Sequence, residues 1–146
     1  MKLWHVGILS EDAEKTVDFL CAAPGADKSK WVFVEVEFPP SEMVVGDGGK
    51  LLAAIGRLGD IVYEILQPLD DKSYHAKVLK ERGPGAHHYA YVCEENQEET
   101  VAALKSAGAR VVWEAVHGNE HVYYLESPID GTVLEIINCL PFMPEE

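Results

Sequence analysis

The chain has 146 residues, of which 12 are Lys or Arg and 25 are Asp or Glu, so its formal net charge is −13. Hydrophobic residues make up 47% and charged residues 25%, which is typical of a folded globular protein and excludes a wholly disordered chain. The acidic excess opposes binding to nucleic acid or to an anionic membrane surface, and no apolar run reaches the roughly 20 residues that span a bilayer.

The cysteines and the first residues indicate a compartment. Cys21, Cys93 and Cys139 are odd in number and contain no CxxC pair, so no disulfide framework is expected. The short apolar stretch before Glu11 and Asp12 does not resemble a secretory signal peptide. We therefore expect a cytoplasmic protein, and its length suits a single domain of about 150 residues.

The first half of the chain predicts four strands and one helix. A strand over 3–9 leads to Ser10, which reads as a helix N-cap, and the helix begins near Ala13 and ends before Pro24. Alternation and turn residues then predict strands over 31–38, 51–57 and 61–67, with a loop over 41–49. The element order is strand, helix, strand, strand, strand.

The second half repeats this order. Residues 70–85 hold a short helix and the Gly83-Pro84-Gly85 break. After the break, the predicted elements are a strand over 86–92, a helix over 97–107, and strands over 109–115, 122–126 and 132–138.

Matching residues support an internal repeat. Thr16-Val17-x-x-Leu20 in the first helix matches Thr100-Val101-x-x-Leu104 in the second, and the last strands match as VYEIL at 62–66 and VLEII at 133–137. The chain is therefore predicted to be α+β, with two tandem βαβββ modules over 1–70 and 86–140 joined by a linker over 71–85.

Each module opens with a strand that carries a histidine and closes with a strand that carries a glutamate. These residues are His5 and Glu64 in the first module, and His88 and Glu135 in the second. Each glutamate shares a strand face with two apolar residues, where a charge is costly to bury unless something pairs with it. Two imidazoles and two carboxylates would neutralise a divalent cation and leave positions open for a substrate.

One stretch of the sequence carries a family resemblance. It runs EILQPL at 64–69, then Ser73 and Ala76, then GPGAHHYA at 83–90. This stretch resembles the vicinal oxygen chelate superfamily of glyoxalases, bleomycin-resistance proteins and dioxygenases, and most of all its methylmalonyl-CoA epimerase branch and glyoxalase I-like members. The resemblance covers residues 3–138.

The resemblance implies a glyoxalase-like fold, in which the modules form curved mixed sheets around a cavity, and a homodimer. It also implies that His5, Glu64, His88 and Glu135 hold one divalent ion, which is Zn, Ni, Co, Mn or Mg. We choose His88 over His87 because only His88 is in register with His5, so His87 is expected on the opposite face of its strand. A fourth ligand, Glu64, favours the lyase and epimerase branches over the three-ligand dioxygenase branch.

The chemistry that the resemblance implies is removal of a proton next to a metal-polarised carbonyl, with Glu135 as the base. The epimerases carry a second acid on the third strand, but 50–55 (KLLAAI) offers none. Glu35 is our substitute, with Glu37 second, because Trp31, Phe33, Glu35 and Glu37 are expected to face the cavity while Val32, Val34, Val36 and Phe38 pack under the helix.

The sequence leaves alternatives open. The substrate is a small carbonyl compound, either an acyl-CoA thioester or a glutathione hemithioacetal. A non-catalytic small-molecule binding protein of the same fold and a member of the dioxygenase branch are the other functions considered. His75, His117 and His121 are expected to be surface loop residues, and one of Tyr123 and Tyr124 is expected to point inward.

Overall fold

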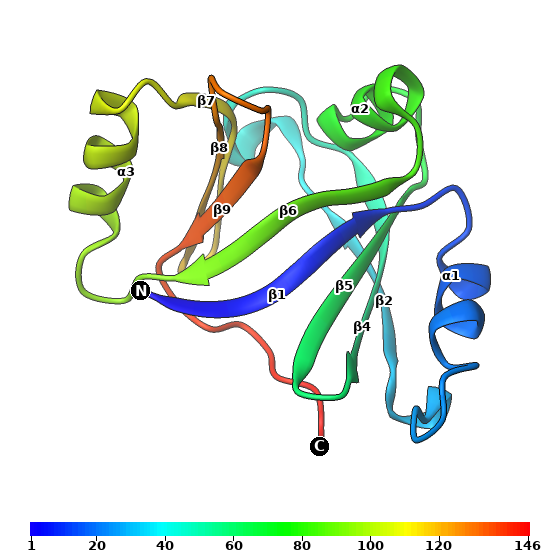
Figure 1. Cartoon of the computed structure of the whole chain (residues 1–146). Helices are drawn as coiled ribbons and strands as arrows, with labels where there is room; N and C mark the ends of the chain where they lie inside the picture. Colours follow the sequence, from blue (N-terminus) through cyan, green and yellow to red (C-terminus); the bar gives the residue numbers. More distant parts are fainter.

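A computed structural model describes all 146 residues as nine strands and three α-helices (Figure 1). The strands are β1 (Lys2–Leu9), β2 (Val32–Glu37), β3 (Met43–Val45), β4 (Lys50–Leu58), β5 (Ile61–Pro68), β6 (Gly85–Val92), β7 (Arg110–His117), β8 (Glu120–Glu126) and β9 (Val133–Ile137). The helices are α1 (Ala13–Leu20), α2 (Tyr74–Arg82) and α3 (Gln97–Ser106), with short 3-10 turns at Lys28–Lys30 and Pro40–Glu42. None of the helices has the length and apolar character needed to cross a membrane.

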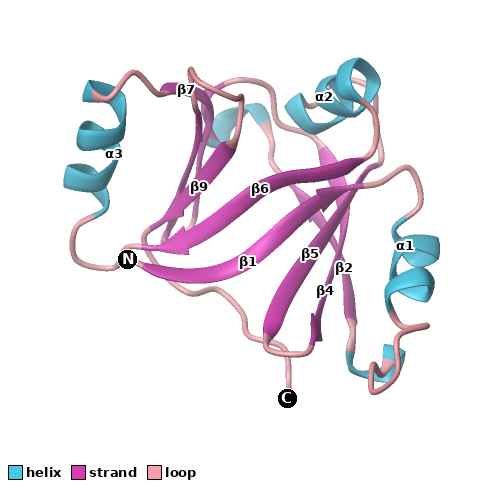
Figure 2. Cartoon of the chain, in the orientation of Figure 1, coloured by secondary structure: helices cyan, strands magenta, loops and turns pink.

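All nine strands belong to one mixed sheet, in the order β2-β4-β5-β1-β6-β9-β8-β7-β3. The sheet curls strongly, so that its two ends face each other across a concave side (Figure 2). This confirms the predicted α+β class and glyoxalase-like curvature. The strands of both halves form a single sheet because β1 and β6 pair antiparallel at its centre.

The sheet is built from two equivalent halves. β1 pairs parallel with β5, and β6 pairs parallel with β9. The outer pairs β4–β5 and β2–β4 are antiparallel, as are β8–β9 and β7–β8. The first and last strands of each half therefore lie at the centre of the sheet, side by side with those of the other half.

Two helices pack on the outer side of the sheet, one on each half (Figure 1). In α1, Ala13 and Val17 are fully buried against β4 and β5, and burying a valine side chain stabilises the fold by about 1.5–3 kcal/mol. The N-cap of α1 is Asp12, whose carboxylate accepts a hydrogen bond from the Lys15 amide, and not Ser10 as predicted. In α3, Val101 packs on β8 and β9.

The segment 41–49 is not the plain loop that was predicted. Residues Met43–Val45 form β3, which pairs antiparallel with β7 of the other half of the chain. The strand has three residues, too few for alternation to reveal it. It extends the sheet beside β7, so that the first half of the chain supplies both edge strands.

Candidate metal centre

The sheet register brings the four predicted donor residues together on the concave side. Gly7 of β1 lies opposite Glu64 of β5 on one side and opposite His88 of β6 on the other. Two residues along β1, His5 lies opposite Ala90, which in turn pairs with Glu135 of β9. Directly paired residues share a sheet face, so these four side chains occupy two adjacent rows across the four central strands.

The donor atoms of these side chains converge. Nε2 of His5 lies 3.0 Å from Nε2 of His88, and 3.5 Å and 3.6 Å from carboxylate oxygens of Glu64 and Glu135. Nε2 of His88 lies 3.0 Å from Oε2 of Glu135 and 3.8 Å from Oε1 of Glu64. His5 and His88 are each 1% exposed and Glu135 is 5% exposed, while Glu64 is half-buried.

Two irregularities in the pairing of β1 with β6 aim the imidazoles. The register shifts between Leu3 and His5, which leaves Trp4 as an extra residue, and again between Gly7 and Ile8, which leaves His87 as an extra residue on β6. A β-bulge of this kind re-aims the neighbouring side chains. Each bulged residue directly precedes one of the two donor histidines.

The bulge corrects one prediction about the histidine pair of β6. Simple alternation places His87 on the opposite face from His88, but Nδ1 of His87 lies 2.9 Å from Nδ1 of His88. The other ring nitrogen of His87, Nε2, lies 3.0 Å from the hydroxyl of Tyr74 on α2. His87 therefore contacts the back of the donor imidazole.

The charges of the group influence one another strongly. Burial raises the pKa of Glu64, and the neighbouring charge of Glu135 adds to the rise. Burial also favours the neutral form of Glu135, but its contacts with His5 and His88 outweigh burial and hold its pKa well below the usual value. Burial disfavours the charged form of His5, yet Glu64 and Glu135 raise its pKa overall. The buried carboxylate of Glu135 and the half-buried carboxylate of Glu64 together favour a bound positive charge.

The donor set fits a divalent cation. All four donor atoms lie within 4.8 Å of one another. First-row divalent ions bind nitrogen and oxygen at about 2.0–2.2 Å, so ligands of one ion are at most about 4.4 Å apart and only small side-chain shifts are needed. Imidazole suits Zn and Ni, and carboxylate suits Mn and Mg, so the mixed set accepts several metals.

The group lies at the wall of a cavity of about 220 Å³ on the concave side. Glu64 and Glu135 line the cavity, β4 contributes Leu51 and Ala53, and the C-terminal segment contributes Phe142. The carbonyl oxygen of Phe142 accepts a hydrogen bond of 2.9 Å from Nε1 of Trp4. The lining is mainly apolar and contains no lysine or arginine.

The orientation predicted for the second strand is wrong. Val34, Val36 and Phe38 face the cavity, so Glu35 and Glu37, which alternate with them, point away from it. Trp31 is buried against α1 instead, in the position where the valines were expected. Both faces of this strand carry large apolar residues, and the bulky indole fills the space under the helix.

Several cavity residues were not expected from the sequence. His75 of α2 is not a surface residue: it is 2% exposed, and its Nε2 lies 3.1 Å from the hydroxyl of Tyr124. Burial lowers the pKa of His75 to about 3, so it is neutral. His117 is exposed, as expected of a surface residue, but it and Glu120 also line the cavity. Alternation along β8 places Glu120 on the same face as Tyr124, but the sequence did not show which face was inside.

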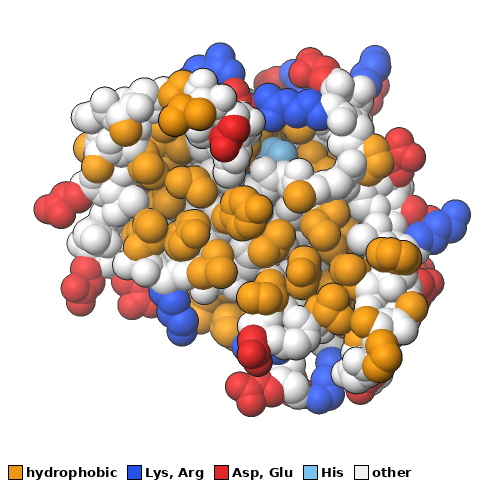
Figure 3. All heavy atoms as spheres, in the orientation of Figure 1, with side chains coloured by type: hydrophobic (Ala, Val, Ile, Leu, Met, Phe, Trp, Pro, Cys, Tyr) orange, Lys and Arg blue, Asp and Glu red, His pale blue; other side chains and the backbone are white.

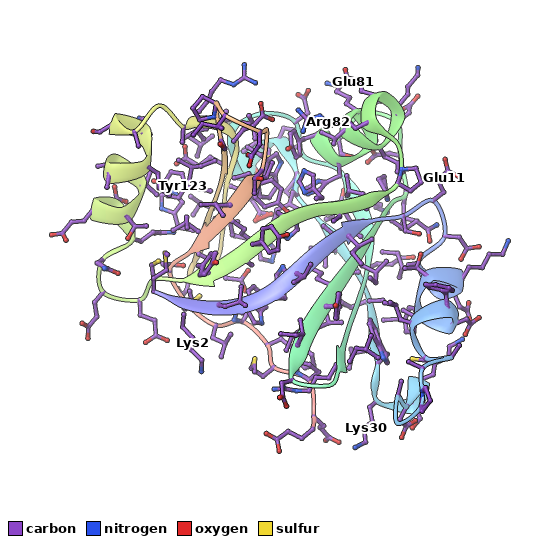
Figure 4. All side chains as sticks on the ribbon, viewed as in Figure 1. Lys2, Glu11, Lys30, Glu81, Arg82 and Tyr123 are labelled. Atoms are coloured by element: carbon purple, nitrogen blue, oxygen red, sulfur yellow. The ribbon has the colours of Figure 1, made fainter.

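Of the two adjacent tyrosines of β8, Tyr124 is the one that points inward. Tyr124 lines the cavity and stacks on His88, with ring centroids 5.0 Å apart. Tyr123 lies on the other face of β8, between the sheet and α3 (Figure 4). On that outer face His121 packs on Tyr123 and lies 2.8 Å from a carboxylate oxygen of Glu114, away from the cavity.

Solved structures with a similar fold cover nearly the whole chain. A hypothetical protein, BH1468 from Bacillus halodurans C-125, is 23% identical with a TM-score of 0.66, and the match covers 97% of this chain and 96% of that one. Methylmalonyl-CoA epimerase from Mycobacterium tuberculosis is 23% identical with a TM-score of 0.63, over 96% and 89% of the chains. A variant of the Streptomyces coelicolor methylmalonyl-CoA epimerase, in complex with 2-nitronate-propionyl-CoA, is 22% identical with a TM-score of 0.59, over 94% and 93%.

Among curated protein sequences, none matches this chain. A family profile does match, over residues 4–124, which is most of the chain and includes three of the four converging donors. Together with the curled mixed sheet, this match assigns the chain to the glyoxalase/bleomycin resistance protein/dioxygenase superfamily.

Proposed function

We propose that this protein is a metal-dependent isomerase or lyase that removes a proton from the carbon next to a carbonyl group. The observation that carries the proposal is the convergence of His5, Glu64, His88 and Glu135 at the wall of a mainly apolar cavity. When bound, a divalent cation supplies polarisation of a carbonyl oxygen, which acidifies the neighbouring C–H bond.

Different residues of the chain would bind the cation, accept the proton and exclude water. His5, His88 and Glu64 hold the cation, and Glu135 holds it and accepts the substrate proton on its carboxylate. The apolar walls contributed by β2 and β4 exclude water from the reacting carbon.

Glu120 is the candidate for a second proton carrier, in place of Glu35. It lines the same cavity from a different strand than Glu135, and burial raises its pKa, which favours the protonated acid. Epimerisation requires a second acid besides the base, and a protonated Glu120 would return a proton to the carbon from which Glu135 removes one.

The preferred substrate is an acyl-CoA thioester of the methylmalonyl-CoA type. Pockets that enclose drug-sized ligands measure about 300–1,000 Å³. The cavity of about 220 Å³ therefore suits a short acyl group, with the rest of the substrate outside. The likeness to methylmalonyl-CoA epimerases supports this choice. A glutathione hemithioacetal, as in glyoxalase I, is the alternative substrate.

A non-catalytic binding protein is the alternative function, and the mainly apolar cavity lining favours it. Two measurements separate these possibilities. Elemental analysis after reconstitution with Zn, Ni, Co, Mn or Mg should find about one ion per chain. Proton NMR in deuterium oxide should then show loss of the α-proton signal of methylmalonyl-CoA, or turnover of methylglyoxal with glutathione. Metal without turnover of either would favour the binding protein, and no metal would overturn the ligand assignment.

We also propose a homodimer in the cytoplasm. On the outer side of the sheet, Val6 pairs with Tyr63 and Tyr89, and Tyr89 pairs with Leu134. Hydrophobic side chains gather on this face between α1 and α3 (Figure 3), and Tyr89 is 44% exposed. A second copy would cover the patch. Sedimentation equilibrium should give a dimer that Tyr89→Glu converts to a monomer, whereas a monomeric wild type would refute it.

A further inference from the structure

A chain of hydrogen-bonding groups leads away from the back of one donor imidazole. Nδ1 of His88 lies 2.9 Å from Nδ1 of His87, and Nε2 of His87 lies 3.0 Å from the hydroxyl of Tyr74. His88 is buried and His87 and Tyr74 are partly buried, so water competes little for these contacts. Of these three residues, only His88 has a role in the proposed function.

The direction of this chain follows from which nitrogen of His88 faces the site. Its Nε2 lies 3.0 Å from Glu135 and 3.0 Å from Nε2 of His5, so Nε2 is the nitrogen available to a cation. An imidazole nitrogen that binds a metal carries no proton, which leaves the ring proton of His88 on Nδ1. Nδ1 of His88 then donates to Nδ1 of His87, and Nε2 of His87 donates to the hydroxyl oxygen of Tyr74.

We propose that His87 is a positioning residue, which sets the ring orientation and tautomer of the metal ligand His88 and is itself oriented by Tyr74. The inference rests on the proposed metal site. Partners of this kind on a ligand histidine raise its basicity, and their loss typically weakens metal binding about 10–100-fold.

The other donor histidine has no such support. Nδ1 of His5 is buried without a hydrogen-bond partner, and the ring is held by an edge-on contact with Trp4 at a centroid distance of 4.3 Å. The two halves of the site are therefore unequal although their backbones are equivalent. The bulge before His5 contributes an indole and the bulge before His88 contributes an imidazole.

Two amide substitutions separate the hydrogen bond from simple packing. His87→Asn places an amide oxygen near the position of Nδ1 and keeps an acceptor for His88. His87→Gln places its amide near the position of Nε2, so it keeps the contact with Tyr74 and loses the acceptor. Tyr74→Phe removes only the outer link and retains the ring.

The experiment titrates metal-free protein with Co²⁺, follows the visible spectrum of the bound ion, and records the melting temperature before metal is added. We expect His87→Gln to weaken Co²⁺ binding at least about 10-fold and to change the spectrum. His87→Asn and Tyr74→Phe both keep an acceptor for His88 and both lose the link between residue 87 and Tyr74, so each should weaken binding by about threefold. The metal-free melting temperatures of the Gln and Asn variants should be similar.

Equal Co²⁺ binding by wild type and His87→Gln would overturn the role of His87 and leave the metal site standing. Equal weakening by Asn and Gln would overturn it as well, since packing would then account for the loss. A wild-type chain that binds no Co²⁺ or Zn²⁺ would overturn the proposed metal site and this inference together. If His87→Gln does not fold, Tyr74→Phe provides the test. Unchanged Co²⁺ binding by Tyr74→Phe would then refute the proposed hydrogen-bonded series from His88 through His87 to Tyr74.

Discussion

The imidazole ring of His88 lies directly over Gly7 of the neighbouring strand, in space that a side chain at position 7 would occupy. A Cβ at Gly7 would come well within 3.0 Å of three atoms of the His88 ring, closer than real Cβ contacts occur. The ring also stacks on Tyr124. A methyl group at position 7 would therefore have to displace the ring.

Gly7→Ala should displace His88 from the group of four donors. We expect metal affinity to fall at least about 10-fold and the free energy of unfolding to fall by about 1–3 kcal/mol, as for other overpacked sites. Metal titration and chemical denaturation of the metal-free protein measure the two effects separately.

Gly56→Ala is the matched control for this substitution. A Cβ at Gly56 would press equally closely on the ring of Trp31, which packs against α1 and not in the cavity. We expect a comparable loss of stability with unchanged metal affinity. If both variants lose metal to the same extent, general destabilisation and not the position of His88 explains the effect.

The sequence predicted the features of the site that depend on alternation within one strand. It did not predict those that depend on the register between neighbouring strands. Alternation along each strand placed His5 with Gly7 and His88 with Ala90, and the structure brings the four donors together from that pattern. The inward turn of His87 could not be predicted, because a bulge adds a residue relative to a partner strand and no single strand reveals it. β1 and β6 are 75 or more positions apart in the chain, so local pattern carries no information on their pairing.

The predicted orientation of β2 was wrong for a different reason. Val34 and Val36 lie on one face and Phe33 on the other, next to Trp31 just before the strand begins, so hydrophobicity alone does not select the buried side. The choice depends on the volume available under α1, where Trp31 closes over Gly56. Likewise, the burial of His75 depends on where α2 lies, which its own sequence does not show.

Replacement of the two carboxylates should separate the base from a simple ligand. Glu135→Gln should lower the rate of α-proton exchange at least about 10²-fold even at saturating metal, because the amide accepts no proton. Glu64→Gln keeps an oxygen donor, so we expect weaker metal binding with most of the exchange rate recovered at saturating metal. Proton NMR in deuterium oxide, over a range of metal concentrations, measures both. The reverse pattern would make Glu64 the base.

Substitution of Glu120 and Glu35 tests for a second proton carrier. Glu120→Gln should block interconversion of the two enantiomers of methylmalonyl-CoA, while one enantiomer still exchanges its α-proton with solvent. Glu35→Gln should change neither rate by more than about twofold, since alternation turns it away from the cavity. Chiral analysis of the products, alongside NMR exchange, distinguishes the two steps. Normal epimerisation by Glu120→Gln would remove this residue from the mechanism.

The buried histidine of α2 should make the stability of the metal-free protein depend on pH. Burial lowers the pKa of His75 to about 3, against 6.5 in the unfolded chain, so the unfolded chain binds a proton that the folded protein does not. Above pH 6.5 both states are neutral at this histidine, and it costs the fold no stability. As the pH falls from 6.5 toward 3, proton uptake by the unfolded chain lowers the free energy of unfolding by up to about 1.4 kcal/mol per pH unit.

Urea denaturation in the presence of a chelator, at pH 7.5 and pH 5.0, measures this loss. Between these values wild type should lose about 1–2 kcal/mol more than His75→Gln, which cannot take up the proton. Tyr124→Phe is the matched control: it removes the hydroxyl that lies 3.1 Å from His75 but keeps the ring buried. Because burial is the main cause of the shift, this variant should retain the pH dependence of wild type. An equally steep loss in His75→Gln would show that other groups account for it.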